Sequence, residues 1–347
     1  MSSHGIIDQK HPSHVSCSDG NSRMLPYKFP ESGWMSHIPT SWLPFAELMR
    51  LDRPNGFWYF YLPHLYGTLH AATHLGSSCV SLLWTNMVLI LGTVVMRGAT
   101  CTWNDTVDAP FDRLVPRTSN RPVARGAVSP FSAHLFTVLQ SFLSLAILTL
   151  LPPFSFAYAL PAIIGWALYP LAKRVTYYPQ VVLGFPMAWG VFMGSVAMGA
   201  DPLQFSSVAA HSGSSLRPRA SICALYAANV LWTLFYEIIY SHQDAAHDVK
   251  AGVKNIVLLY HGRTKPLLVK LAVGQVLLLA GAGWLDEVGA CYWTFVVFGA
   301  ASTLTTIIVR VKLDVPDDCA WWFKFGCCRL TGGAMAVGML GEYLTAT

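Results

Sequence analysis

Charged residues are scarce in this sequence. Only 12% of its 347 residues are Asp, Glu, Lys or Arg, whereas a soluble domain carries about 25%. Hydrophobic residues make up 53%, and the mean hydropathy is +0.43. Few charges remain to cover a water-exposed surface, so the composition predicts an integral membrane protein in contact with lipid.

Motifs that would indicate other classes are also missing. No basic run has interleaved aromatic residues, so the net charge of +5 does not indicate nucleic-acid binding. The eight cysteines form no C-x-x-C pair and no Cys/His metal spacing, and are expected to be reduced. Residues 1–40 are rich in Ser, His, Pro and Gly and lack a signal-peptide core. We expect a disordered cytosolic tail there, followed by one transmembrane domain over residues 41–347.

Apolar segments of membrane length recur along the chain. About 20 apolar residues cross a bilayer once, so these segments predict an all-α bundle of about nine transmembrane helices. The expected spans are 55–72, 79–101, 131–151, 154–172, 179–200, 220–241, 266–285, 289–310 and 321–344. Lys and Arg concentrate in the loops after the second, fourth, sixth and eighth spans, which places those loops in the cytosol.

An acidic stretch follows the second span. Its polar residues are Asn104, Asp105, Asp108 and Asp112, which share an arc of about 100° on a helix. Pro110 is expected to kink or end that helix. Carboxylates are the ligands of a hard cation, and Mg²⁺ commonly binds through a few of them plus substrate phosphates. Basic side chains that suit the same phosphates come next: Arg113, Arg117, Arg121 and Arg125.

A second acidic stretch ends the sixth span. Glu237, Asp244 and Asp248 fall within about 40° on one helical face. The loop charges place both stretches on the cytosolic side. Two such clusters could hold opposite sides of one diphosphate–metal complex.

These stretches resemble the paired motifs of the UbiA-type membrane prenyltransferases. The first is similar to N-D-x-x-D-x-x-x-D, followed by R-x-x-x-R-P and G-A-V-S. The second is similar to Y-x-x-x-Y-x-x-Q-D-x-x-D-D-x-x-x-G-V-K-S, although His247 stands where the family usually has aspartate and Asn255 replaces serine. Segments 51–56 and 169–180 also resemble family motifs. His247 points about 60° away from Asp244 and 100° away from Asp248 on a helix. This direction favours a role other than metal ligation, either as a hydrogen-bond partner of a metal ligand such as Asp248 or as a group beside the aromatic acceptor.

The resemblance implies a UbiA-like bundle with a central cavity, in which Mg²⁺ and basic side chains bind an isoprenyl diphosphate. Asn104 and Tyr240 are expected to take part in catalysis. The expected metal ligands are Asp105, Asp108, Asp112, Asp244 and Asp248. The expected substrate-binding residues are Arg53, Arg97, Arg117, Arg121, Lys173, Arg174, Glu237, His247 and Lys254. For some of these a structural role stays open: a snorkelling Arg53, an Arg97–Glu237 ion pair, or Lys173 and Arg174 following the positive-inside rule.

The residues of these motifs resemble those of the family branch found in fungal meroterpenoid pathways. Its members typically farnesylate a polyketide-derived phenol or phenolic acid. We therefore expect Mg-assisted ionisation of a diphosphate, which by resemblance is farnesyl diphosphate, and capture of the cation by a phenolic ring. The resemblance places this reaction in the endoplasmic reticulum membrane, with the site facing the cytosol. The alternatives are a 4-hydroxybenzoate polyprenyltransferase of ubiquinone synthesis, a UbiA-type terpene cyclase, and a carrier of an anionic metabolite. A carrier is disfavoured because carriers bind near the bilayer midplane.

Overall fold

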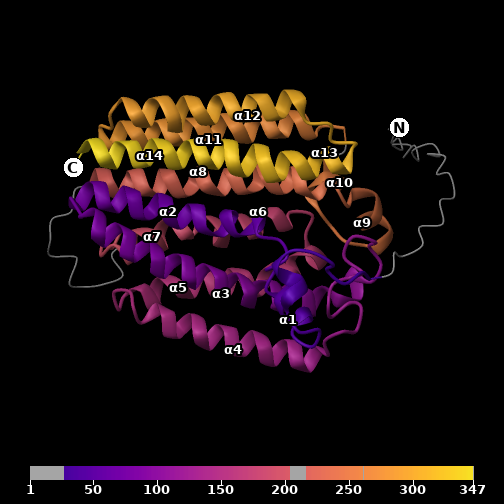
Figure 1. Ribbon diagram of the computed structural model, residues 1–347. Helices are drawn as coiled ribbons and strands as arrows, with labels where there is room; N and C mark the ends of the chain where they lie inside the picture. Colours follow the sequence, from indigo (N-terminus) through magenta and orange to yellow (C-terminus); the bar gives the residue numbers. More distant parts are fainter. Residues whose placement is uncertain (1–26, 204–215, 261, 347) are drawn as a thin grey trace, which may run out of the picture.

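The computed structural model describes residues 27–203, 216–260 and 262–346. Every element in these ranges is a helix, and the long helices run side by side in one bundle (Figure 1). The first half of the bundle consists of α2 (Asn55–Leu75), α3 (Cys79–Asp112), α4 (Pro130–Leu148), α5 (Ser155–Val175), α6 (Pro179–Ala188) and α7 (Gly190–Ala197). The second half consists of α8 (Leu216–Ser241), α11 (Thr264–Asp286), η3 (Tyr292–Phe298), α12 (Gly299–Arg310), η4 (Trp322–Gly332) and α14 (Gly333–Ala346).

Seven of the nine predicted spans coincide with helices, or consecutive helix pairs, that are long and apolar enough to cross a membrane. The other two predicted ranges are also helical, as α2 and as η4 with α14. Their hydropathy is lower because α2 contains His64 and His70, and η4 contains Lys324 and Arg329. The all-α polytopic fold is confirmed.

The outer surface of the bundle is apolar. Large side chains on α3, α4 and α5 point outward, including Leu83, Phe142 and Leu160, each more than half exposed. Such residues would be unfavourable in water, whereas lipid accepts them. The chain is therefore an integral membrane protein.

The helix α3 is longer than the sequence predicts. We expected Pro110 to kink or end it, but the helix continues through Pro110 to Asp112. Proline removes one N–H bond, and here that loss falls in the last turn, where only two residues remain. Asp108 and Asp112 therefore stay one turn apart on the same helix.

Short helices gather at one end of the bundle. They are η1 (Trp34–His37), α1 (Leu43–Leu48), α9 (Ala245–Ala251), α10 (Ile256–Leu259) and α13 (Pro316–Trp321). In Figure 1, α1, α9, α10 and α13 lie at the same end as the start of α2 and the loop that follows α3. This end carries both acidic stretches.

Candidate active site

A cavity of about 640 Å³ lies at this end of the bundle. Its volume is within the range of roughly 300–1,000 Å³ that is usual for small-molecule sites. Residues of α2, α3, α5, α6, α8 and η4 line it, together with the loops after α3 and α8. Both acidic stretches contribute to its wall, as predicted from the loop charges.

The first stretch contributes two aspartates to the wall, each paired with a basic side chain. Asp108 accepts a hydrogen bond of 2.7 Å from Lys173 at the end of α5. Asp112 accepts one of 2.9 Å from Arg121. Both aspartates are buried, so the basic partners offset the cost of burying their charge.

The second stretch contributes Asp244 and Asp248. Arg117 donates from Nε to both carboxylate oxygens of Asp244, at 2.8 and 3.0 Å, and from Nη1 to the Tyr240 hydroxyl, at 2.8 Å. Asp248 accepts a bond of 2.6 Å from the Asn255 amide. Since Arg117 follows α3, its contact with Asp244 joins the two acidic stretches directly.

Asp105 does not line the cavity, although it shares Arg121 with Asp112. Its side chain is fully buried behind the cavity wall and pairs with Arg50 at 2.5 Å and with Arg121 at 3.0 Å. We predicted Asp105 as a metal ligand, but the structure does not place it on the cavity. Asn104, on the same helix, does line the cavity, and its buried Oδ1 accepts no hydrogen bond from the described residues.

The loop after α3 contains four arginines with two different placements. Arg117 and Arg121 line the cavity. Arg113 instead donates to the Ala124 carbonyl at 3.0 Å, and Arg125 pairs with Glu47 of α1 at 2.7 Å. Arg113 and Arg125 thus stabilise the loop itself, and of the four arginines only Arg117 and Arg121 lie on the cavity.

The neighbours of the charged side chains at this end of the bundle shift their pKa values. Burial opposes the charge on Arg121, but the carboxylates of Asp105 and Asp112 outweigh burial and raise its pKa. Burial, followed by the neighbouring Asp244, raises the pKa of Asp248 to about 6, although the Asn255 hydrogen bond opposes this shift. The site thus contains fixed cations beside Asp248, a carboxylate that is protonated more easily than usual.

Arg97 and Glu237 both line the cavity, but they do not form the ion pair that we considered. Arg97 is buried and donates to the backbone carbonyls of Arg50 and Arg53, at 3.1 and 2.8 Å. It therefore stabilises the start of α2. Glu237 takes part in none of the ion pairs between the described residues, which leaves its carboxylate available to a ligand.

Three further predicted cations lie at the rim. Arg53 is half-exposed and pairs with its neighbour Asp52 at 3.1 Å. Arg174 donates to the Val107 carbonyl at 2.8 Å, and Lys254 to the Val175 carbonyl at 3.3 Å. All three line the cavity, so the structure brings them to the predicted site.

Several polar residues of the cavity wall were not predicted from the sequence, among them Arg50, Gln180 and Lys324. Arg50 lines the cavity while it holds Asp105, and Gln180 donates to the Ser241 hydroxyl at 3.0 Å. Lys324 lines the cavity from η4. An ionisable residue inside an apolar span is a signal of function, and this signal could have identified Lys324.

Apolar side chains form another part of the wall. Phe60 of α2 stacks on Trp166 of α5, with ring centroids 4.9 Å apart, and Leu183 and Met187 of α6 also line the cavity. The cavity thus combines a charged region with an apolar region, which suits a ligand with a phosphate head and a hydrocarbon chain.

His247 is not among the cavity-lining residues, whereas Asp244 and Asp248 are. Its backbone N–H bonds to the Asp244 carbonyl at 2.8 Å. We therefore expect His247→Ala to lower prenyl transfer by less than about tenfold, well below the loss from a cavity aspartate. Diphosphate release, measured beside Asp244→Asn, tests this expectation. Near-complete loss in both variants would place His247 in the ionisation machinery.

Comparisons with known proteins agree with this site. The model of the UbiA prenyltransferase family matches residues 60–328. The mitochondrial 4-hydroxybenzoate polyprenyltransferase of Schizosaccharomyces pombe is 34% identical, over 85% of this chain and 78% of its own length. Prenyltransferase stbC of Stachybotrys bisbyi is 33% identical, over 88% and 91%, and prenytransferase ascA of Acremonium egyptiacum is 31% identical, over 84% and 83%.

Solved structures share the fold. A UbiA homolog from Aeropyrum pernix superposes with a TM-score of 0.61 at 23% identity, over 83% of this chain and 97% of that one. A UbiA homolog from Archaeoglobus fulgidus bound to GPP and Mg²⁺ gives a TM-score of 0.60 at 19% identity, over 87% and 99%. Taken with the family match, these findings show that the chain is a membrane prenyltransferase and belongs to the UbiA prenyltransferase family.

Proposed function

We propose that this protein transfers a farnesyl group from farnesyl diphosphate to a polyketide-derived phenolic acceptor, with Mg²⁺ as cofactor. The observation that carries the proposal is the pairing of acids with bases around one cavity. Asp108, Asp112 and Asp244 each hold a basic side chain there. A metal cation that binds the aspartates would take the place of these basic side chains. A diphosphate that binds at the same time would pair with the basic side chains, so every charge would remain compensated.

The donor set fits Mg²⁺, which prefers hard oxygen ligands. The two acidic stretches offer carboxylate oxygens from four aspartates of the cavity wall: Asp108, Asp112, Asp244 and Asp248. The unpartnered Oδ1 of Asn104 adds an amide oxygen. Mg²⁺ bound there would offset the negative charge that grows on a departing diphosphate. The solved Archaeoglobus fulgidus homolog bound to GPP and Mg²⁺ supports this assignment.

The basic side chains bind the diphosphate. Lys173, Arg117 and Arg121 are within hydrogen-bond reach of the aspartates and share the cavity with them. Once the aspartates hold a cation, these bases donate to the phosphate oxygens and stabilise the leaving group as the allylic C–O bond breaks. The Phe60–Trp166 wall holds the prenyl chain and keeps water from the carbocation.

The acceptor ring captures the carbocation. A ring carbon ortho to the phenol forms the new C–C bond, and the ring then loses its proton at that carbon to the released diphosphate. Glu237, a cavity carboxylate outside the ion pairs, can accept a hydrogen bond from the phenol hydroxyl. Lys324 and Arg53, on the same cavity, can bind an acidic group on the acceptor.

A second candidate is the prenylation of 4-hydroxybenzoate by a long polyprenyl diphosphate. The observation that favours it is the identity of 34% to the yeast mitochondrial enzymes of that name, which is similar to the identity with ascA and stbC. The two candidate functions also differ in the cellular membrane where the protein would act. We propose the endoplasmic reticulum membrane, with the cavity facing the cytosol, whereas the second candidate belongs in mitochondria.

The test uses membranes from cells that express the full chain. We expect farnesyl transfer to resorcinol-type phenolic acids, read by mass spectrometry, and complete loss of transfer in excess EDTA. Product with 4-hydroxybenzoate and a long polyprenyl diphosphate only, in mitochondrial membranes, would support the second candidate. A cyclised terpene formed without acceptor would identify a cyclase. Full turnover in EDTA would exclude the metal assignment.

A further inference from the structure

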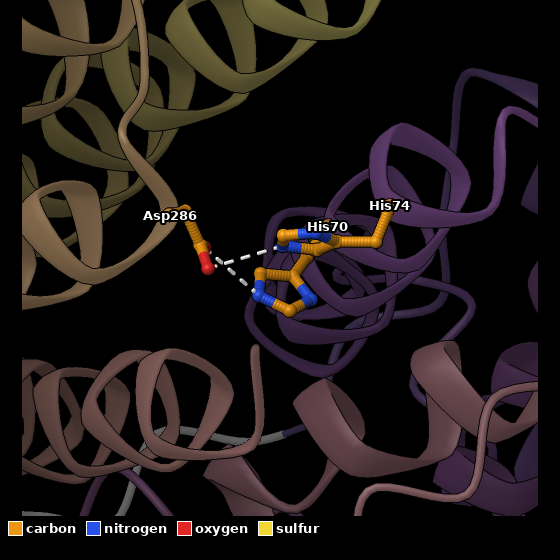
Figure 2. A group of neighbouring side chains, drawn as sticks. All are labelled: His70, His74 and Asp286. Atoms are coloured by element: carbon orange, nitrogen blue, oxygen red, sulfur yellow. Dashed lines mark ion pairs between the residues drawn. The ribbon is translucent and has the colours of Figure 1, made fainter. Parts of the chain in front are cut away.

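A second group of ionisable side chains lies far from the aspartates. His70 and His74 are one turn apart on α2, and Asp286 is the last residue of α11. Figure 2 shows both imidazole rings approaching the Asp286 carboxylate from the neighbouring helix. With a rise of about 1.5 Å per residue, His70 lies more than about 20 Å along α2 from Asn55 at the active-site end.

The geometry of this group is close to that of a metal site. His70 Nε2 lies 3.1 Å from one oxygen of Asp286, and His74 Nε2 lies 3.1 Å from the other. The three ligand atoms lie within 4.8 Å of one another. Four ligands around a tetrahedral zinc ion are about 3.4 Å apart. His74 is partly exposed, so its ring has room to close on an ion.

A hydroxyl group orients the carboxylate. Ser221 of α8 donates to Asp286 Oδ2 at 2.7 Å, and its oxygen lies 2.7 Å from His70 Nε2. Ser221 and His70 are buried, and Ser221 also lies near the Pro218 carbonyl, at 3.2 Å. Outer partners of this kind fix the ligands of protein metal sites.

The charge of Asp286 requires a partner. Its side chain is only 8% exposed, and its ion pairs with the described residues are those to His70 and His74. A buried carboxylate is costly unless its charge is compensated. A divalent ion held by the three side chains would compensate this charge.

We propose that His70, His74 and Asp286 bind a divalent transition-metal ion of the zinc class. Two histidines four residues apart on one helix with a carboxylate as third ligand form a known zinc donor set. The intervening residues are Ala-Ala-Thr, so the glutamate that serves as a base in zinc hydrolases is missing from this segment. This segment therefore departs from the zinc-hydrolase pattern, and we assign the bound ion a structural role.

The role follows from the helices that it joins. The main packing partners of α2 are α7 and α3, whereas α11 packs along α8. A metal ion held by both would fasten the far end of α2 to α11. Since α2 begins at the cavity with Asn55 and Gly56, such a link restrains the helix that carries one cavity wall.

The experiment measures bound zinc in the purified full chain. The protein is equilibrated with zinc, desalted and analysed for metal by mass spectrometry. We expect about one zinc more per chain in the parent than in His70→Gln or His74→Gln. His134→Gln, which changes an exposed histidine on α4, is the control and should match the parent. Cobalt in place of zinc should give ligand-field absorption bands that both site variants lose.

Stability gives a second readout. A zinc chelator should lower the Tm of the parent and of His134→Gln by at least about 4 °C and leave His74→Gln unchanged. If His70→Gln does not fold, His74→Gln still tests the site, because it keeps the buried His70–Asp286 contact. Equal zinc in the parent and His74→Gln would overturn the proposal and identify a metal-free His–Asp network. Neither readout uses prenyl transfer, so this result is independent of the proposed function.

Discussion

Asparagine in place of Asp108 or Asp244 should lower prenyl transfer by about 10²-fold or more, which is the cost of losing one preorganised electrostatic contact. Each change keeps the shape of the side chain and removes one negative charge from the cavity wall. Lys173 and Arg117, the partners of these aspartates, would then have no acid to hold them. The measurement is turnover at saturating diphosphate and Mg²⁺, per amount of folded protein.

Both variants should still fold. The side chains of Lys173 and Arg117 are 24% and 30% exposed, so water in the cavity can hydrate the cation that each change leaves behind. Asp314→Asn, at an exposed position outside the cavity, is the matched control and should retain the parent activity. A well-folded Asp108→Asn that turns over within threefold of the parent would remove Asp108 from the site.

The same assay distinguishes Asp105, which lies behind the cavity wall, from the aspartates that line the cavity. Since it pairs with Arg50 and Arg121 behind the wall, Asp105→Asn should reduce the yield of folded protein. The Mg²⁺ concentration for half-maximal transfer should stay unchanged. Asp108→Asn, on the cavity, should raise that concentration.

The helical spacing explains which part of this site could be predicted. Steps of 100° place Asn104, Asp108 and Asp112 within about 80°, and Asp105 at about 100° lies just beyond them. The arc drawn from the sequence was wide enough to include all four residues. In the structure the cavity wall contains the first three and ends before Asp105. Periodicity gives the direction of a side chain, but it does not give the edge of a cavity.

The partners of the aspartates were harder to predict, because they come from distant parts of the chain. Arg50 and Asp105 are separated by 55 positions, and Arg117 and Asp244 by 127. Motif resemblance supplied Arg117, whereas nothing in the local pattern singled out Arg50. The same limit applies to the alternative considered for Arg97, an ion pair with Glu237, which the structure does not form. The backbone carbonyls of Arg50 and Arg53, just before α2, accept hydrogen bonds from the Arg97 guanidinium instead.

Alanine in place of Gly67 should cost at least about 3 kcal/mol of stability, at the upper end for overpacking. Gly67 of α2 faces α7, and an added Cβ would overlap the backbone carbonyl oxygen of Val191. A backbone atom cannot rotate away as a side chain can, so the two helices must separate. Gly194 on α7 repeats this arrangement, because a Cβ there would overlap the backbone oxygen of His64. Small residues allow membrane helices such an approach.

The stability measurement compares thermal unfolding of Gly67→Ala with that of Gly281→Ala. Gly281, in α11, has no atom within 4 Å of an added Cβ, so its change to alanine should leave Tm unchanged or raise it. Gly67→Ala should lower Tm by many degrees or abolish folding, because α2 carries Tyr59 and Phe60 to the cavity and cannot move away from α7 without disturbing them. A Tm within about two degrees of the parent, or about 1.5 kcal/mol for a chain of this length, would mean that α2 and α7 cross less closely than the structure has them.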